Sequence, residues 1–228
     1  MTAKNDHIRG ESGSLSAAAQ RGLFQLPRRL DFLHDSLPEA PSNILDVGCA
    51  GGYIGLVLQR LGHRVTGVEL NEAMAAQARQ RGIEVVEHDL EEPVPLPDGS
   101  FDVVHACEVI EHLFDTEGFL HDLARLLRPG GTLVVSSPNL NSLSNRWRVL
   151  RGSALPMWGA SPSDRHGGHI RVFNRATLEE LLHRTGFTPV KTIGSNQGGR
   201  LARMLDRTPN LSELILVRAH REEVIPSR

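Results

Sequence analysis

The chain has few aromatic residues, few cysteines, almost no lysine and no long apolar run. Aromatic side chains make up only 4% of its 228 residues, so any core must consist mainly of Leu, Val, Ile and Ala. Because Cys49 and Cys107 are the only cysteines, a disulfide scaffold is excluded and a reducing compartment is favoured. No run reaches the roughly 20 apolar residues of a membrane-spanning helix, and the first residues lack the apolar stretch of a signal peptide. We therefore expect a cytoplasmic protein without a membrane span.

The charge is nearly balanced, with a formal net charge of −2. This balance disfavours a nucleic acid partner held by a strongly basic fold. Positive charge comes almost entirely from arginine, since Lys4 and Lys191 are the only lysines. Hydrophobic residues at 39% and charged residues at 23% are typical of globular proteins. The length fits one domain and is too short for two of ordinary size.

Composition divides the chain into a leader, one domain and a tail. Residues 1–19 are small and polar, and we expect them to form a mobile leader. Residues 20–221 predict a single domain, and residues 222–228 a tail. Within the domain, residues 139–172 are rich in Asn, Ser, Gly, Pro and Arg, and we expect a variable lid over the acceptor there.

Apolar runs alternate with amphipathic stretches along the first two thirds of the domain. Five runs are typical of buried strands, at residues 43–48, 64–70, 83–88, 101–107 and 132–137. Helices are predicted over residues 52–61, 71–81 and 114–127, while a Pro-rich loop over 91–99 stands where a further helix would be. Strands that alternate with helices at this spacing predict an α/β fold with a mostly parallel sheet and helices on both faces.

The two ends of the domain are less regular. One or two helical pieces, broken near Pro27, are predicted between residues 22 and 37. A turn is predicted at residues 128–131, and a short helix around residues 145–150. A last helix is predicted over residues 175–185, followed by strands at 188–195 and 211–220.

The first strand ends in a glycine-rich turn, and a helix follows it. Gly48, Gly51 and Gly52 let a ligand approach the backbone closely at the start of this helix. The dinucleotide-binding fingerprint requires glycines at relative positions 1, 3 and 6, but Ala50 and Tyr53 stand at the last two of these. Because Tyr53 would crowd a pyrophosphate, the turn fits a ligand without phosphates better than NAD.

Carboxylates follow the first three strands. Glu69 ends the second strand, some twenty residues after Asp46, where a carboxylate accepts both hydroxyls of a ribose. Asp89 follows the third strand, within reach of an adenine amino group. Because parallel strands end at one edge of the sheet, these residues predict a crevice for a nucleoside.

Five motifs in this order resemble the successive motifs of class I S-adenosylmethionine-dependent methyltransferases: ILDVGCAGG, VTGVELN, EHDLEE, FDVVHACEVIEHL and LLRPGGTLVVSSPN. The resemblance covers about residues 27–220. It implies a Rossmann-like seven-stranded sheet of order 3-2-1-4-5-7-6, with the last strand antiparallel. It also implies S-adenosyl-L-methionine as the cofactor, with its methionine part on Gly48, Ala50 and Gly52, its ribose on Glu69, and its adenine beside Asp89 and Leu90. Gly51, Leu70 and Cys107 lie in the same motifs and are further expected contacts.

The entry segment LPRRLDFL is similar to that of the ubiquinone-pathway O-methyltransferases. In that family an arginine matching Arg29 approaches the carboxylate of the cofactor. The alternative is that Arg29 is a solvated arginine on a helix.

The motif EVIEH, which follows the fourth strand, holds the candidate catalytic groups. On one helical turn, Glu108, Glu111 and His112 would share a face at a carboxyl strand end. In one interpretation His112 is a general base oriented by a carboxylate such as Glu111. In the other, these three residues and His169 bind a divalent cation (Mn, Mg, Zn or Fe) that lowers the pKa of the acceptor. His166 is an alternative to His169, and polar pocket lining is the non-functional interpretation.

The same motif, with a later histidine, also resembles the metal site of RNA 3′-terminal 2′-O-methyltransferases. The expected lid supports an anionic acceptor, because it and the residues beside it carry six arginines and one acid: Arg146, Arg148, Arg151, Arg165, Arg171, Arg175 and Asp164. A solvated cationic loop is the alternative for this segment.

Three functional hypotheses follow from these residues. The leading one is an enzyme that transfers a methyl group from S-adenosylmethionine to a small molecule, most simply to an oxygen. Methylation of an RNA terminus with a divalent metal is the second. A non-catalytic module that binds the cofactor is the third.

Overall fold

The computed structural model describes residues 26–38, 41–155, 169–196 and 204–223. The expected leader and most of the expected tail lie outside these residues, as do the middle of the lid and His166. None of the described helices is long and apolar enough to cross a membrane.

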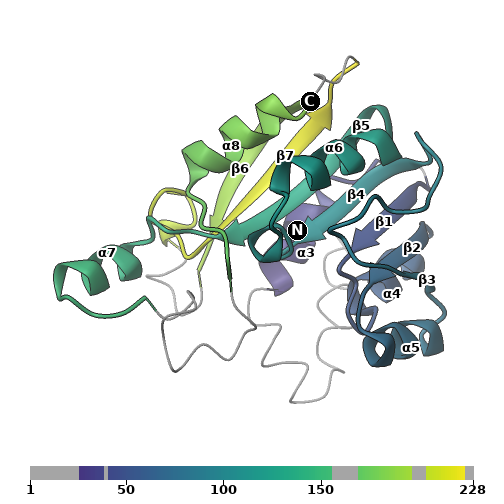
Figure 1. Cartoon of the computed structure of the whole chain (residues 1–228), viewed down its shortest axis with the longest axis horizontal. Helices are drawn as coiled ribbons and strands as arrows, with labels where there is room; N and C mark the ends of the chain where they lie inside the picture. Colours follow the sequence, from purple (N-terminus) through teal and green to yellow (C-terminus); the bar gives the residue numbers. More distant parts are fainter. Residues whose placement is uncertain (1–25, 39–40, 156–168, 197–203, 224–228) are drawn as a thin grey trace.

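Seven strands form one sheet in the order β3-β2-β1-β4-β5-β7-β6, as the resemblance implied (Figure 1). Pairing is parallel from β3 to β5, whereas β7 runs antiparallel to both β5 and β6. The strands are β1 Asn43–Val47, β2 Arg64–Glu69, β3 Glu84–Glu87, β4 Phe101–Cys107, β5 Leu127–Pro138, β6 Phe187–Ser195 and β7 Leu214–Arg221.

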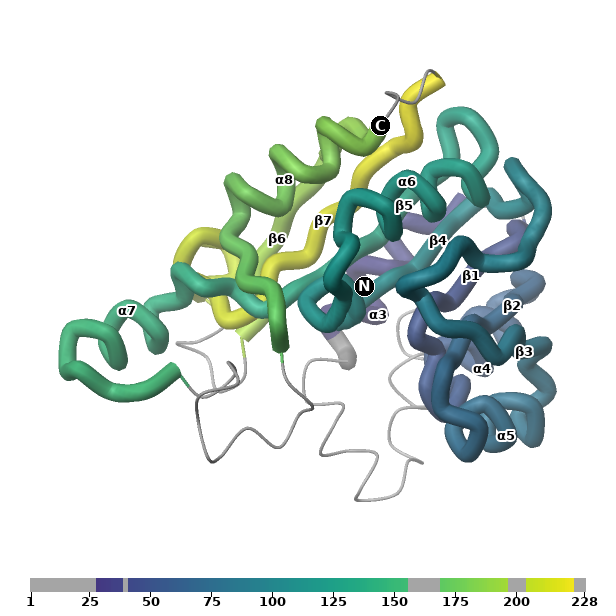
Figure 2. Tube along the Cα trace, viewed as in Figure 1, coloured from purple at the N-terminus to yellow at the C-terminus, as the bar shows by residue number. Residues whose placement is uncertain are grey.

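Six α-helices and one short 3-10 helix are named in the described residues. They are α3 Leu26–His34, α4 Tyr53–Arg60, α5 Glu72–Gln80, η1 Ile110–His112, α6 Thr116–Leu126, α7 Leu143–Leu150 and α8 Arg175–Arg184. Asn71, Asp115 and Asn174 cap α5, α6 and α8, because each side chain accepts a hydrogen bond from a backbone N–H in the first turn. Figure 2 shows α8 running along the β6–β7 end of the sheet.

The core has two layers, one on each face of the sheet. Alternation along the strands divides neighbours between them, so that Val104 faces one layer and Val103 the other. Leu120 of α6 and Leu178 of α8 belong to the first layer, while Leu33 of α3 belongs to the second. Both faces are therefore covered by helices, as expected for a parallel sheet.

One local prediction needs correction and another stays open. The helix α3 starts at Leu26, with Pro27 in its first turn, where its missing N–H costs no hydrogen bond. Residues 22–25 lie outside the described ones, so the predicted break near Pro27 stays a prediction. Residues 128–131 do not form a separate turn, because β5 starts at Leu127 and includes them. The left-handed backbone of Gly130 (φ 69°) and a register shift against β4 absorb the irregularity there.

The carboxyl ends of the parallel strands meet at one edge of the sheet. Because β6 runs parallel to β5 and β7 runs antiparallel, the end of β6 and the start of β7 lie at this same edge. The glycine-rich turn, the EVIEH motif and the start of the expected lid all follow these strand ends. The fold therefore brings the predicted site residues to one side of the molecule.

Candidate functional site

The glycine-rich turn between β1 and α4 is built on left-handed backbone. Gly48 has φ 66°, Ala50 has φ 46° and Gly52 has φ 76°. Ala50 thus adopts a conformation that a side chain disfavours. Gly52 is the N-cap of α4, and no side chain caps this helix. The first N–H groups of α4 are therefore left for water or a ligand at the carboxyl edge of the sheet.

Gly52 has no room for a side chain. A Cβ atom built there would lie 2.8 Å from the Cβ of Ala78 on α5. We expect Gly52→Ala to lower the free energy of unfolding by about 2–4 kcal/mol, because left-handed strain and overpacking add. Gly62→Ala is the matched control: it is also left-handed (φ 89°) but has nothing within 4 Å, so it reports the strain alone. Denaturant unfolding of both variants makes the comparison, and equal losses would contradict the packing argument.

Glu69 ties the turn to the end of β2. Its Oε2 accepts a hydrogen bond from the Ala50 N–H (2.9 Å), and its Oε1 accepts one from the Asn71 N–H (2.8 Å). The side chain is half-buried, and each oxygen keeps a further lone pair. The carboxylate is thus fixed in place beside the glycine turn, with acceptors available for the two hydroxyls of a ribose.

The other expected cofactor residues differ in exposure. Asp46 is buried in β1, where its Oδ1 pairs with Nδ1 of His105 at 2.8 Å. Asp89 is exposed after β3, and Leu70 is 65% exposed at the rim. Leu90 is half-buried against the core. Asp46 is therefore held inside the sheet by His105, whereas Leu70 and Asp89 are exposed at the carboxyl edge.

Gly51 contributes its backbone, which accepts a hydrogen bond from Arg81, the C-cap residue of α5. The Arg81 guanidinium donates to the Gly51 carbonyl (2.8 Å) and to the Tyr53 hydroxyl (2.8 Å), and it stacks over the Tyr53 ring. The tyrosine at the start of α4 is thereby fixed beside the turn. This contact gives Tyr53 a structural role that the sequence did not suggest.

Arg29 points from α3 toward the end of β4. Its guanidinium lies beside Cys107, Glu108 and Glu111, whose negative charges raise its pKa against the opposing effect of burial. The Nε atom is buried and has no hydrogen-bond partner among the described residues. An anionic group at this edge would find an unused donor there, so the interpretation of Arg29 as a solvated helix residue does not fit the structure.

Glu108 does not share a helical face with Glu111 and His112, which corrects the sequence prediction. Its backbone is left-handed (φ 59°) and precedes η1. Its Oε1 instead accepts a hydrogen bond from the Ser136 hydroxyl at 2.8 Å. Burial raises the pKa of Glu108, although Arg29 and Ser136 oppose this.

Glu111, His112 and His169 form a compact cluster. One potential ligand atom from each lies within 4.8 Å of the others, and Glu108 is not part of this group. The rings of His112 and His169 meet edge to face, with centroids 4.7 Å apart. His169 Nε2 is 3.9 Å from Glu111 Oε1. The structure thus brings together three of the four candidate ligands.

Backbone hydrogen bonds bring His169 to this place. The N–H groups of Ile170 and Arg171 both donate to the Glu111 carbonyl at 3.0 Å. The Arg171 side chain also donates to the carbonyls of Leu113 and Phe114. The segment that starts at His169 is therefore bound to η1 by its backbone, independently of the imidazole.

Both carboxylate oxygens of Glu111 are buried, and neither has a hydrogen-bond partner among the described residues. Burial, reinforced by Glu108, raises the pKa of Glu111 to about 9. A buried carboxyl group in this state keeps its proton at neutral pH unless a cation replaces it.

This pKa shift predicts a dependence of stability on pH. Glu111 in the unfolded chain ionises near 4.5, whereas the folded group keeps its proton up to about pH 9. Because the folded state binds more protons in this window, the free energy of unfolding should fall as pH rises through it. Glu111→Gln cannot ionise, so it should lose less stability than the native chain between about pH 5 and pH 8. Urea unfolding at about pH 5 and pH 8 tests this, with Glu84→Gln, a change at an exposed glutamate, as the control. If the native chain and both variants lost the same free energy of unfolding between these pH values, the prediction would be contradicted.

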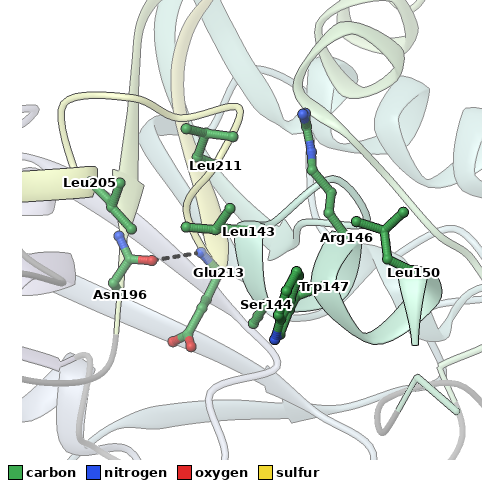
Figure 3. A pocket seen from close by; sticks show the side chains of 9 residues that line it. All are labelled: Leu143, Ser144, Arg146, Trp147, Leu150, Asn196, Leu205, Leu211 and Glu213. Carbon is green, nitrogen blue, oxygen red and sulfur yellow. Dashed lines mark hydrogen bonds between the residues drawn. The ribbon is translucent and has the colours of Figure 1, made fainter. Parts of the chain in front are cut away.

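An apolar groove lies beyond the end of β5, at the carboxyl edge of the sheet. It has a volume of about 590 Å³ and lies between α7, the end of β6 and the segment before β7 (Figure 3). The apolar lining residues are Leu143, Trp147, Leu150, Leu205 and Leu211. The helix α7 has no buried residue and stands apart from the sheet in Figure 1. The groove has the size of a small-molecule site.

The arginines of the expected lid mostly have local partners. Arg146 donates to the Asn141 carbonyl, and Arg151 stacks on Trp147. Arg171 is bound to η1 as described, and Arg175 pairs with Glu179 on α8. Arg165 lies outside the described residues. Arg148 and Arg151 line one small pocket beside Trp147, and the expected anionic acceptor stays a prediction.

Comparisons with known proteins agree with this geometry. Residues 19–192 match the family described as methyltransferase domain. The chain is 36% identical over 166 residues to a Mycolicibacterium smegmatis protein named "Probable S-adenosylmethionine-dependent methyltransferase", which covers 72% of this chain and 59% of that protein. It is 35% identical over 184 residues to the ubiquinone biosynthesis O-methyltransferase of Maricaulis maris, covering 74% and 71%. A SAM-dependent methyltransferase structure from Thermotoga maritima has a TM-score of 0.68 at 22% identity, covering 90% of this chain and 95% of that one.

The sheet order and the glycine-rich turn define the class I methyltransferase fold. The chain belongs to the family of S-adenosylmethionine-dependent methyltransferases, through its methyltransferase domain. It spans 59% of the length of the Mycolicibacterium relative and 50% of that of a Xanthomonas oryzae ubiquinone biosynthesis O-methyltransferase.

The sequence did not indicate two residues of the site, His105 and Ser136. His105 forms a hydrogen bond with Asp46, and the Ser136 hydroxyl donates one to Glu108. The alternation in the strand FDVVHAC places His105 on the same face as Cys107, which was a usable indication. Ser136 lies opposite Cys107 only through the β4–β5 register, which local sequence does not specify.

Proposed function

We propose that this protein transfers the methyl group of S-adenosylmethionine to an oxygen of a small-molecule acceptor, with a divalent cation at Glu111, His112 and His169. The observation that carries the proposal is the arrangement of two groups at one sheet edge. One is the glycine-rich turn with Glu69, and the other is the Glu111–His112–His169 cluster at the end of β4.

The cofactor residues present fit the proposed cofactor. The left-handed turn and the uncapped start of α4 allow close approach, and Glu69 has acceptors for ribose hydroxyls. The unpartnered Nε of Arg29 suits a carboxylate such as that of the methionine part. The sulfonium of the cofactor supplies the activated methyl group, so the chain has to bind, orient and exclude water.

The acceptor must lose a proton when a hydroxyl is methylated. Two imidazoles and a carboxylate whose oxygens lack hydrogen bonds make a donor set for Mn, Fe or Zn. A cation held there would lower the pKa of an acceptor hydroxyl. We favour a cation over His112 acting alone as a general base. Both oxygens of Glu111 lack a hydrogen-bond partner among the described residues, and a bound cation would give them one, whereas a histidine base would not.

The apolar groove supports a small-molecule acceptor with an apolar part. It begins where α7 follows the carboxyl end of β5, at the same edge as the proposed cofactor site. The curated relatives include ubiquinone biosynthesis O-methyltransferases. The acceptor that we propose is therefore a phenol with an apolar substituent, whose substituent occupies the groove.

Trp147→Ala tests the groove. With catechol and an alkyl-substituted catechol as acceptors, the native protein should show a KM about tenfold lower for the alkylated one, from burial of the chain. Trp147→Ala should remove most of this difference while kcat stays within about twofold. Val149→Ala is the control, since Val149 is exposed on α7 but does not line the groove. A KM ratio unchanged by Trp147→Ala would contradict this placement.

Methyl transfer from labelled S-adenosylmethionine tests the function as a whole. Phenols, sugars and an RNA oligonucleotide with a free 3′ end serve as acceptors, each with Mn²⁺ and with chelator. We expect turnover on a phenol, stimulated by Mn²⁺. Turnover on the RNA alone would favour the RNA-terminal methyltransferase hypothesis, and cofactor binding without turnover on any acceptor would favour the non-catalytic module.

A further inference from the structure

Glu91 lies in the loop after β3, and its carboxylate binds the loop that follows η1. Its Oε1 accepts a hydrogen bond from the N–H of Phe114 at 2.8 Å, and its Oε2 accepts one from the N–H of Asp115 at 3.3 Å. Hydrogen bonds to a charged acceptor are stronger than those between neutral groups. One carboxylate therefore fixes two neighbouring peptide units of that loop.

Arg171 binds the same two peptide units at their carbonyl groups. Its Nε donates to the carbonyl of Leu113 at 3.3 Å, and its Nη2 donates to the carbonyl of Phe114. The Leu113 carbonyl shares a peptide unit with the Phe114 N–H, and the Phe114 carbonyl shares the next one with the Asp115 N–H. In a trans peptide the carbonyl and the N–H point in opposite directions. Both units therefore lie between a carboxylate and a guanidinium, and we call this arrangement the peptide clamp.

Side-chain packing holds only part of the clamped loop. Leu113 is buried in the core, but the side chain of Phe114 is 71% exposed, and Asp115 is exposed as well. The element before the loop, η1, is a single 3-10 turn, which is too short to fix the direction of the chain by itself. The two charged side chains of the clamp therefore determine the path of the chain after η1.

The peptide clamp is continuous with the Glu111–His112–His169 cluster. The main-chain N–H of Arg171 donates to the Glu111 carbonyl at 3.0 Å, as does that of Ile170, the residue after His169. Arg171 thus binds carbonyl groups on both sides of His112, with its main chain before it and its side chain after it. A shift of the clamped loop would therefore move His112 relative to His169.

We propose that Glu91 and Arg171 are positioning residues for methyl transfer, and that through the peptide clamp they hold His112 in place beside Glu111 and His169. The inference rests on the proposed function, because it assumes that the cluster takes part in the reaction. Both side chains act through the backbone of another segment. Residues that orient the ligands of a site in this way typically affect its activity by 10- to 100-fold.

The main chain of Glu91 also links the clamp to the expected adenine contact. Its N–H donates to Oδ1 of Asp89 at 3.0 Å. A substitution of the Glu91 side chain keeps this N–H, so it removes the bonds to the clamped loop and leaves the bond to Asp89. The role of Glu91 at the cluster can therefore be measured separately from any role at the cofactor.

Amide hydrogen exchange, measured by NMR on the full chain, tests the clamp independently of catalysis. In Glu91→Ala the amides of Phe114 and Asp115 should exchange faster, because they lose their acceptor. The amides of Ile170 and Arg171 should also exchange faster, by roughly three- to tenfold, because the loop no longer holds η1 in place. Faster exchange confined to Phe114 and Asp115 would indicate a local tether and overturn the proposal, and so would native exchange at all four amides.

Steady-state kinetics with labelled S-adenosylmethionine and catechol test the positioning role. Glu91→Ala should lower kcat by about 10- to 100-fold. Its affinity for S-adenosylhomocysteine should stay within about twofold, because the bond to Asp89 is retained. Glu91→Gln keeps one acceptor oxygen and should have an intermediate kcat. Equal losses of kcat and of affinity in Glu91→Ala would mean that Glu91 acts on the cofactor instead.

Glu92→Ala is the matched control. Glu92 is exposed like its neighbour Glu91, but its carboxylate accepts no hydrogen bond from residues 113–115, so the variant should keep the native kcat. The same loss of kcat in Glu92→Ala as in Glu91→Ala would reduce the effect to one of charge and overturn the proposal.

Arg171→Met tests the other half of the clamp. It keeps the main-chain bond to Glu111 and should lower kcat about as much as Glu91→Ala. The double variant should lose no more than about twofold beyond the larger single loss, because both side chains act on the same peptides. Losses that multiply in the double variant would contradict a clamp that acts as a unit. If circular dichroism shows that Arg171→Met does not fold, Glu91→Gln and the exchange measurement still decide.

The two kinds of measurement separate this proposal from the proposed function. If the native chain methylates no acceptor, the proposed function fails, and exchange at Ile170 and Arg171 still shows whether the clamp holds the cluster in place. If the native chain is active and folded Glu91→Ala keeps its kcat, the positioning role fails and the proposed function stands.

Discussion

Replacement of His169 with alanine is expected to lower the rate of methyl transfer by about 100- to 10,000-fold, the usual contribution of a group that assists proton removal. His169 is buried beside Glu111 and His112, and backbone bonds from Ile170 and Arg171 hold its segment in place. The substitution should therefore remove the imidazole without releasing the segment. Initial rates at saturating S-adenosylmethionine measure the loss.

The same variant separates the two roles of the cluster. If a cation is bound there, calorimetry should show Mn²⁺ binding to the native chain and none to His169→Ala. The affinity for S-adenosylhomocysteine should stay within about twofold, because the cluster is separate from Glu69. His183→Ala is the control, since His183 is exposed on α8. Activity retained in His169→Ala, or lost equally in His183→Ala, would contradict a role of the cluster in the reaction.

Replacement of Glu69 with alanine is expected to weaken the binding of S-adenosylhomocysteine by about 10- to 100-fold. Hydrogen bonds to a charged group contribute about 1.5–3 kcal/mol, and Glu69 is placed for both hydroxyls of the ribose. Part of the loss would come from the glycine-rich turn, because Glu69 also holds the N–H groups of Ala50 and Asn71. Isothermal titration calorimetry measures the change in affinity.

Glu69→Gln divides these two contributions. The amide keeps one oxygen and the shape of the side chain but loses the charge, so it should bind with intermediate affinity. Glu84→Ala, an exposed glutamate on β3, is the control and should bind like the native chain. An affinity of Glu69→Ala equal to that of the native chain would mean that the ribose lies elsewhere.

The strands were predictable because the pattern that indicates each of them is local in the sequence. Apolar runs such as NILDVG and TLVVSS indicate buried strands. Because these strands alternate with helices, few arrangements other than a parallel sheet are possible. Glu69 was predictable as well, since a carboxylate that ends the strand next to the glycine turn has to face it. The family motifs supplied the strand order itself.

The geometry of the EVIEH motif was not predictable in the same way. Regular helical spacing would have placed Glu108 with Glu111 and His112, but the backbone turns left-handed at Glu108 and directs that carboxylate to Ser136. The partner of Glu108 lies on another strand, so only the β4–β5 register decides the outcome. The prediction that His169 lies with Glu111 and His112 is confirmed. The alternative residue, His166, lies outside the described residues.

The break predicted near Pro27 is not tested, because α3 starts at Leu26 and the residues before it lie outside the described ones. A proline interrupts a helix when it removes a needed N–H, and in the first turn of α3 none is needed. The position of the helix start therefore decided the effect of the residue. That position depends on the packing of Leu30 and Leu33 in the core, which the proline itself does not reveal.

The most direct test of the account is calorimetric titration of the full chain with S-adenosylhomocysteine and, separately, with NADH. A crevice formed by the glycine-rich turn, Glu69 and Arg29 should bind the first with micromolar affinity, about −8 kcal/mol. It should not bind the second, because we expect Tyr53 at the start of α4 to crowd a pyrophosphate. Absence of S-adenosylhomocysteine binding by the folded chain, or binding of NADH in its place, would contradict the central claim.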